Sequence, residues 1–171
     1  MLLIAFALPI IFPMKLAQKV AYLLIKKKKT LSLAESCTGG LLSHALTNIP
    51  GSSTFFKVGI IAYANEAKQK LLNVSSATIK KHGVVSFPAI EQMAKGVRSI
   101  LKTDFSVAIS GIAGPTGATA TKPLGLTFIA VSSKNRMNSF HFVFKGSRLS
   151  IKKQAATKAL TILLDLLNET K

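Results

Sequence analysis

Apolar residues recur at helical spacing in three long stretches of the chain. These stretches are residues 14–27, 86–101 and 149–168, and in each of them apolar side chains return every three or four residues. Ser86 and Pro88 mark the start of the second stretch, because serine caps helices and proline is tolerated in the first turn. We therefore expect amphipathic helices near both ends of the chain and in its middle.

Strand-like segments lie between these helices. Short apolar or alternating runs occupy residues 30–34, 57–63, 105–110, 126–133 and 138–145, and shorter helices are expected at 41–48 and 78–82. We also expect Asn65 to cap a helix that follows the second run and carries Lys68 in its first turns. A short polar turn at 134–136 joins the last two runs, which indicates an antiparallel hairpin. The order of elements predicts the α/β class: a three-layer α/β/α sandwich on a mixed, mainly parallel five-stranded sheet.

The first 13 residues are entirely apolar and include two prolines. A membrane-spanning helix needs about 20 apolar residues. A signal peptide carries positive charge ahead of its apolar core, whereas Lys15 follows this segment. We therefore expect residues 1–13 to be an extension upstream of the native start at Met14, and residues 14–171 to form one domain. The mass of the native N-terminus tests this expectation.

The net charge is strongly positive, with 23 Lys and Arg against 6 Asp and Glu, or +17. Such a charge attracts phosphates, nucleic acids and acidic membranes. The lysines are scattered, however, and the run Lys26–Lys29 suits the negative end of a helix dipole. We interpret the charge as a solvated surface and expect neither a specific nucleic-acid partner nor a membrane partner.

The only cysteine, Cys37, excludes an intramolecular disulfide and a Cys-rich zinc site. A reducing, cytoplasmic location fits this composition. The three histidines are far apart and have no ligand spacing, so we expect no metal. No His or acidic residue stands at a suitable spacing to activate Cys37, which favours a buried, apolar role for this thiol over a nucleophilic one.

Three polar, Gly-rich stretches begin where predicted strands end. They are residues 35–40, 63–68 and 110–115, the last running on to 122–125. In open α/β sheets, ligands bind at the carboxyl ends of the strands. We therefore expect these three stretches to form one site.

Ser36 is a candidate nucleophile ahead of a predicted helix, whose free N–H groups could stabilise an oxyanion. A serine hydroxyl needs a neighbouring base, however. His44 is eight residues away, about 12 Å along a helix, which is too far. Lys68 is the better candidate, because a desolvated lysine can lose its proton near neutral pH. Tyr63 could relay a proton or hold the hydroxyl between Ser36 and Lys68.

Structural interpretations remain open for the same residues. Ser36 or Thr38 could only cap the following helix. Lys68 could be solvated on a helix surface, Tyr63 could be a packing residue, and Glu35 could pair with a lysine or cap the helix.

The Gly-rich loop 111–125 has two interpretations as well. It could be a long turn, or its backbone donors could meet an anion. It lacks the Lys-Ser/Thr ending of a P-loop, and no dinucleotide fingerprint follows a strand. Arg148 starts the last predicted helix and is a natural ligand for a phosphate or a carboxylate.

Together these motifs resemble the C-terminal domain of the competence-damage-inducible protein CinA, whose stand-alone members are nicotinamide-nucleotide amidases. The motifs that carry the resemblance are residues 34–40, 50–53, 63–68, 82–86, 110–115 and 122–125, in that order. The similarity spans roughly residues 16 to 165.

The resemblance implies hydrolysis of nicotinamide mononucleotide to nicotinate mononucleotide and ammonia, in pyridine nucleotide salvage, without a cofactor. It implies Ser36 as the nucleophile, with Lys68 and Tyr63 as its activating partners, and Arg148 as the phosphate ligand. The other substrate-binding positions that it implies are Thr38, Gly39, Gly40, Ser110, Gly111 and Gly114. It also implies the three-layer fold read above and a homo-oligomer.

The chain departs from the family pattern in the loop at residues 116–121, and at Ser147 and Lys152. The family usually has more glycine and an acidic residue in this loop, Asp at the position of Ser147 and Arg at that of Lys152. These changes concern the ribose and phosphate contacts more than the amide chemistry. An alternative is therefore a degenerate, non-catalytic member that binds a nucleotide or another anion. Nucleic-acid binding through the lysines is a third hypothesis, which predicts a steep loss of affinity with added salt.

Overall fold

The structure, a computed structural model, describes residues 14–169. The predicted extension at residues 1–13 lies outside them. The helices are α1 (Met14–Lys26), α2 (Leu41–Thr47), α3 (Asn65–Leu72), α4 (Ser76–His82), α5 (Phe87–Leu101), α6 (Arg148–Glu169) and the short 3₁₀ helix η1 (Ser52–Thr54). The strands are β1 (Leu31–Glu35), β2 (Phe56–Ile61), β3 (Phe105–Gly111), β4 (Leu126–Ser133) and β5 (Met137–Val143).

The five strands form one mixed sheet in the order β2-β1-β3-β4-β5. β1 pairs in parallel with both β2 and β3, while β3–β4 and β4–β5 are antiparallel. Four strands therefore point in one direction and β4 in the other, and the predicted hairpin is confirmed. Glu35 lies opposite Ile61 on one side and Ile109 on the other, so the carboxyl ends of β2, β1 and β3 meet at one edge.

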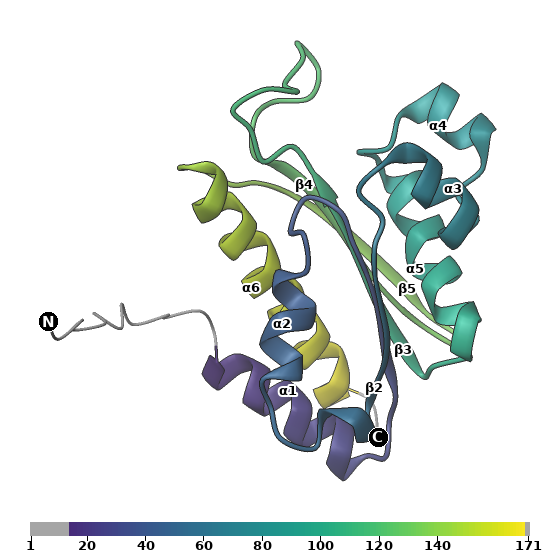
Figure 1. Cartoon of the computed structure of the whole chain (residues 1–171), viewed down its shortest axis with the longest axis vertical. Coiled ribbons are helices and arrows are strands. Elements are labelled where there is room, and N and C mark those ends of the chain that lie inside the picture. The colour runs from purple at the N-terminus through teal and green to yellow at the C-terminus, as the bar shows by residue number, and fades with distance from the viewer. Residues whose placement is uncertain (1–13, 170–171) are drawn as a thin grey trace, which may run out of the picture.

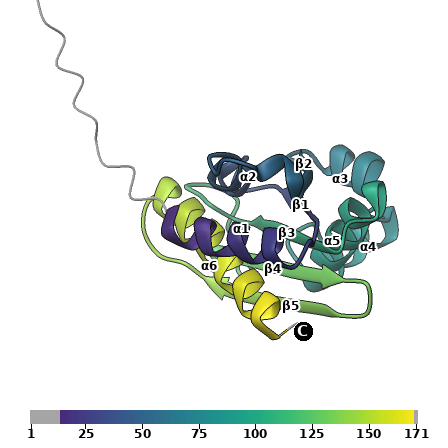
Figure 2. The same ribbon diagram turned by 90° about the horizontal axis from the view of Figure 1, so that it is seen from below.

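Helices cover both faces of the sheet, which confirms the three-layer α/β/α fold. α1, α2 and α6 lie on one face and α3, α4 and α5 on the other (Figures 1 and 2). The helical periodicity read from the sequence explains this arrangement, because α6 buries Ile151, Ala155 and Leu163 while α5 buries Ile90 and Met93. Two separate apolar clusters result, one on each face.

Helix α3 packs very closely against α5. A Cβ atom at Gly96 would overlap the carbonyl oxygen of Leu72, the last residue of α3. Only glycine allows this approach, and the contact fixes the position of α3 against α5. Among residues 14–169, none of the helices is long and apolar enough to cross a membrane.

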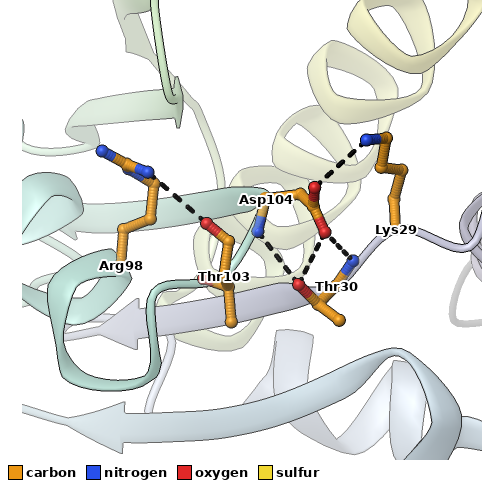
Figure 3. A network of polar contacts seen from close by, with 5 residues as sticks. All are labelled: Lys29, Thr30, Arg98, Thr103 and Asp104. Atoms are coloured by element: carbon orange, nitrogen blue, oxygen red, sulfur yellow. Dashed lines mark hydrogen bonds and ion pairs between the residues drawn. The ribbon is translucent and has the colours of Figure 1, made fainter.

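A polar network ties together the amino ends of β1 and β3, at the edge opposite the Gly-rich stretches (Figure 3). The carboxylate of Asp104 accepts hydrogen bonds from the Thr30 amide at 2.9 Å, the Thr30 hydroxyl at 2.8 Å and the Lys29 ammonium at 3.1 Å. The Asp104 amide in turn donates to the Thr30 hydroxyl. The chain entering β1 is thus fastened to the chain entering β3.

Candidate active site

The turn after β1 is anchored by the buried carboxylate of Glu35. Its two oxygens accept hydrogen bonds from the amides of Gly40 at 3.1 Å, Leu42 at 3.1 Å and Ser43 at 2.7 Å, and from the Ser43 hydroxyl at 2.6 Å. A negative charge is favourable at this position because it faces the amino end of α2. Glu35 therefore caps the helix rather than pairing with a lysine.

This arrangement changes the expected roles of the neighbouring residues. The N-cap position of α2 is Gly40, with no side-chain capping bond, so neither Ser36 nor Thr38 caps the helix. The expectation that free amides of this helix stabilise an oxyanion is wrong for Gly40, Leu42 and Ser43, because these amides donate to Glu35.

Ser36 follows β1 directly and is a buried residue. Its amide donates to the carbonyl oxygen of Ile109 at 2.9 Å, which fixes the backbone against the end of β3. The residue is 8% exposed. Among the described residues its hydroxyl has no hydrogen-bond partner, so it is available to a ligand.

Lys68 is 2% exposed, which contradicts the interpretation of a solvated lysine. Its Nζ donates to the carbonyl oxygens of Ala62 at 2.8 Å and Tyr63 at 3.1 Å. Burial lowers the pKa of this ammonium below its usual range, because desolvation disfavours the charged form. The neutral amine has two N–H bonds and one lone pair, so the two carbonyls leave the lone pair free to accept a proton.

Tyr63 is 59% exposed, at the mouth of the site. Arg148, the first residue of α6, donates one hydrogen bond to the Tyr63 hydroxyl at 2.6 Å and another to the carbonyl oxygen of Gly114 at 2.5 Å. A guanidinium group can only donate. The Tyr63 hydroxyl therefore accepts from Arg148 and keeps its own proton for another acceptor.

A pocket of ≈ 210 Å³ joins these groups. Six predicted site residues line it: Ser36, Tyr63, Lys68, Ser110, Gly111 and Arg148. Thr38, Gly39, Gly40 and Gly114 do not line it, although Gly114 contacts Arg148 through its carbonyl group. The pocket is also lined by residues whose side chains had no predicted catalytic or binding role, namely Cys37, Asn65, Val84, Val85 and Ala113.

Cys37 lies beside Ser36 but does not have the properties of a nucleophile. Burial raises the pKa of its thiol to about 11, since the thiolate would lose its hydration. The thiol therefore stays protonated at neutral pH. The expected buried position of Cys37 is confirmed.

Two segments border the pocket: the Gly-rich loop that follows β3, and the segment between α4 and α5. Hydrogen bonds join them to each other. The Ser110 hydroxyl donates to the carbonyl oxygen of Val84 at 3.2 Å, which joins the end of β3 to the segment before α5. Lys122, in the Gly-rich loop, donates to the carbonyl oxygen of His82 at 2.8 Å. The Gly-rich loop is thus tied to the C-terminal end of α4.

Four other hollows on the described residues are larger, of ≈ 590, ≈ 490, ≈ 310 and ≈ 290 Å³, and the two of greatest volume are grooves along α6 and the end of the hairpin. None of the predicted site residues lines either groove. Volume alone would favour these grooves, whereas the chemistry of the side chains favours the smaller pocket. We therefore take the smaller pocket as the candidate active site.

The fold and this pocket define a three-layer α/β protein with a serine and a buried lysine at the carboxyl ends of parallel strands. The family model of the CinA C-terminal domain matches residues 13–167, and the chain belongs to this family.

Known proteins of this family are similar in sequence and in structure. A CinA-like protein of Endomicrobium trichonymphae is 44% identical over 86% of this chain and 35% of its own length. The nicotinamide-nucleotide amidohydrolase PncC of Shewanella oneidensis is 46% identical over 72% of this chain and 29% of its own length. The chain thus spans about a third of the length of these curated relatives.

Solved structures extend the similarity to nearly all of the described fold. The competence damage-inducible protein A of Klebsiella pneumoniae superposes with a TM-score of 0.89 at 30% identity, covering 92% of this chain and 98% of that one. The CihA protein of Agrobacterium tumefaciens gives a TM-score of 0.84 at 37% identity, covering 91% and 94%.

Proposed function

We propose that this domain hydrolyses the carboxamide of nicotinamide mononucleotide to give nicotinate mononucleotide and ammonia. The observation that carries the proposal is the shared pocket of Ser36, whose hydroxyl is unpartnered within residues 14–169, and Lys68, whose pKa is lowered by burial. The name of the Shewanella oneidensis relative supports the choice of substrate.

In the proposed reaction, the Lys68 amine takes the proton of the Ser36 hydroxyl, and the serine oxygen attacks the carboxamide carbon. The tetrahedral intermediate then collapses, the C–N bond breaks, and the Lys68 ammonium returns the proton to the leaving nitrogen, which departs as ammonia. A water molecule, deprotonated by Lys68, attacks the acyl-serine ester, the ester C–O bond breaks, and the carboxylic acid is released. The Lys68 ammonium returns its proton to the Ser36 oxygen, which restores both groups. Each step uses the same pair of groups, as in other serine hydrolases with a single base.

Tyr63 is proposed to donate its hydrogen bond into the pocket during these steps. Arg148 occupies an acceptor position of the tyrosine oxygen and leaves the O–H available. A positioned donor stabilises the negative charge that develops on the serine oxygen and on the carboxamide oxygen. This role is compatible with the predicted activation of Ser36.

The small volume of the pocket indicates which part of the substrate it holds. Ligand pockets commonly measure roughly 300–1,000 Å³, and this one measures ≈ 210 Å³. It is therefore suited to the pyridine carboxamide end, while the ribose phosphate stays at the mouth. Arg148 is exposed there, and the N–H groups that it does not donate to Gly114 and Tyr63 can bind the phosphate.

Ammonia release from nicotinamide mononucleotide tests the proposal directly. We expect Ser36→Ala to reduce the rate by roughly 10³-fold or more, because the nucleophile is lost. The matched control is Ser53→Ala, which removes an exposed hydroxyl from η1 and leaves the rate unchanged. Full activity in Ser36→Ala would exclude Ser36 as the nucleophile. Tight binding without turnover in the unmodified protein would favour the non-catalytic alternative.

A cytoplasmic location and a homo-oligomeric state also remain predictions. Cell fractionation tests the first, and light scattering on the purified protein tests the second.

A further inference from the structure

Asn65 lies in the candidate active site through its place on α3. The expectation that Asn65 caps this helix is wrong, because Ala64 is the N-cap residue and makes no side-chain capping bond. Asn65 is the first helical residue, three positions before Lys68, and residues at this spacing share a helix face. Both side chains line the pocket.

The hydrogen bonds within the pocket single out two polar side chains. Lys68, Tyr63, Ser110 and Arg148 are each held by a hydrogen bond to another part of the protein. In the described part of the chain, no partner is found for the Ser36 hydroxyl or for the side-chain amide of Asn65. Ser36 and the exposed Asn65 are therefore, among the described residues, the two polar side chains of the pocket that no protein hydrogen bond holds in place.

A carboxamide is well suited to recognise another carboxamide. The Asn65 side chain offers one acceptor oxygen and two N–H donors, and a primary amide substrate offers the same groups. The hydrolysis product is different, because a carboxylate has no N–H to donate and carries a negative charge. An asparagine oxygen directed at the amide nitrogen would thus attract the substrate and repel the product.

We propose that Asn65 is the specificity-determining residue of this pocket, which selects a primary carboxamide over the corresponding ester and carboxylate. Its Oδ1 accepts a hydrogen bond from the substrate NH₂ group while Ser36 attacks the adjacent carbon. The remaining pocket-lining side chains that sequence analysis did not assign, Cys37, Val84, Val85 and Ala113, supply walls without a comparable acceptor. This inference rests on the proposed function.

Kinetics with two matched substrates test the inference. We expect Asn65→Ala to lower kcat/KM for nicotinamide mononucleotide by roughly ten- to hundredfold, the effect of leaving one polar group of the substrate unpaired. The methyl ester of nicotinate mononucleotide has no N–H, so its kcat/KM changes much less. The control is Gln69→Ala, which removes a carboxamide from the same helix outside the pocket and alters neither substrate. An equal loss for the amide and the ester would overturn the inference.

A binding measurement separates this inference from the proposed function. In the Ser36→Ala background, which needs no turnover, calorimetry compares the affinities for nicotinamide mononucleotide and nicotinate mononucleotide. We expect a preference for the amide that Asn65→Ala removes and Gln69→Ala keeps. An unchanged preference in Asn65→Ala overturns the specificity role, whereas absence of turnover in the unmodified protein overturns only the proposed hydrolysis.

Discussion

Arg148 and Tyr63 are joined by a hydrogen bond of 2.6 Å between the guanidinium group and the phenol oxygen. The bond links the first residue of α6 to the segment that follows β2. A second N–H group of Arg148 donates to the carbonyl oxygen of Gly114 in the Gly-rich loop. One side chain therefore holds three segments around the mouth of the pocket. Arg148 can affect catalysis through Tyr63 as well as through a phosphate.

Substitution of Arg148 separates these two effects. We expect Arg148→Gln to raise KM for nicotinamide mononucleotide by about tenfold or more, because a charge-assisted contact to phosphate is lost. Nicotinamide riboside has no phosphate, so its KM stays nearly constant. Steady-state kinetics with both substrates is the measurement. Equal effects on the two substrates would show that Arg148 acts only by positioning Tyr63.

The lowered pKa of Lys68 predicts how the rate depends on pH. The amine is a base only when neutral, and burial shifts the neutral form to lower pH. The rate should therefore fall as the pH decreases through this lowered pKa, and activity should persist well below the ordinary lysine value of 10.5. Lys68→Arg stays protonated and should lose activity at every pH tested.

The exposed lysine on the same helix provides the control for this profile. Lys70 forms a surface pair with Glu66, and Lys70→Arg should keep the wild-type curve. A pH–rate profile that Lys68→Arg leaves unchanged would be incompatible with a lysine base.

Glu35 is expected to contribute strongly to stability. In Glu35→Gln, an NH₂ group replaces one oxygen that accepts two hydrogen bonds, and the negative charge at the amino end of α2 is lost. We expect a loss of about 2–3 kcal/mol in the free energy of unfolding. Chemical denaturation measures it. The control Glu66→Gln, in an exposed pair, should change stability by less than about 0.5 kcal/mol.

Asp104 predicts an acid-sensitive contribution to stability. Partial burial alone would raise the pKa of this carboxyl, but hydrogen bonds from Thr30 and the charge of Lys29 outweigh it and hold the pKa below its usual value of 3.8. The stabilisation is thus present above the unfolded-state pKa and is lost as the pH falls through the lower folded-state pKa.

Thermal unfolding at several pH values tests this prediction. Asp104→Asn should lower the melting temperature near pH 7 and make the acid side of the stability curve less steep. Asp165→Asn, at an exposed position of α6, should keep the wild-type curve. If Asp104→Asn and the unmodified protein lose stability in parallel below pH 5, the range where carboxylates protonate, Asp104 is not the responsible group.

The fold could be predicted because each element carries its own periodicity. The apolar faces of α5 and α6 and the hairpin of β4 and β5 depend on local pattern, and the structure confirms them. The approach of Ser36 to Lys68 was also predictable, since both follow strands whose carboxyl ends meet in a parallel arrangement.

Other features depend on packing that no local pattern records. Lys68 lies on a helix with few apolar residues, and its Nζ is held inside by the carbonyl oxygens of Ala62 and Tyr63, which belong to the segment before the helix. The cap by Glu35 depends on how α2 returns over the end of β1. Asn65 looked like a capping residue; its spacing of three from Lys68 was the one available signal that it shares the pocket.

The anchoring around Asp104 and the reactive groups around Ser36 occupy opposite rims of the same sheet, as the course of β1 and β3 requires. Substitutions near Asp104 can therefore raise or lower the stability of the fold without changing the shape of the pocket. That edge is therefore a suitable place to attach a fluorescent label or an immobilisation linker, because a group attached there leaves the pocket free during activity measurements.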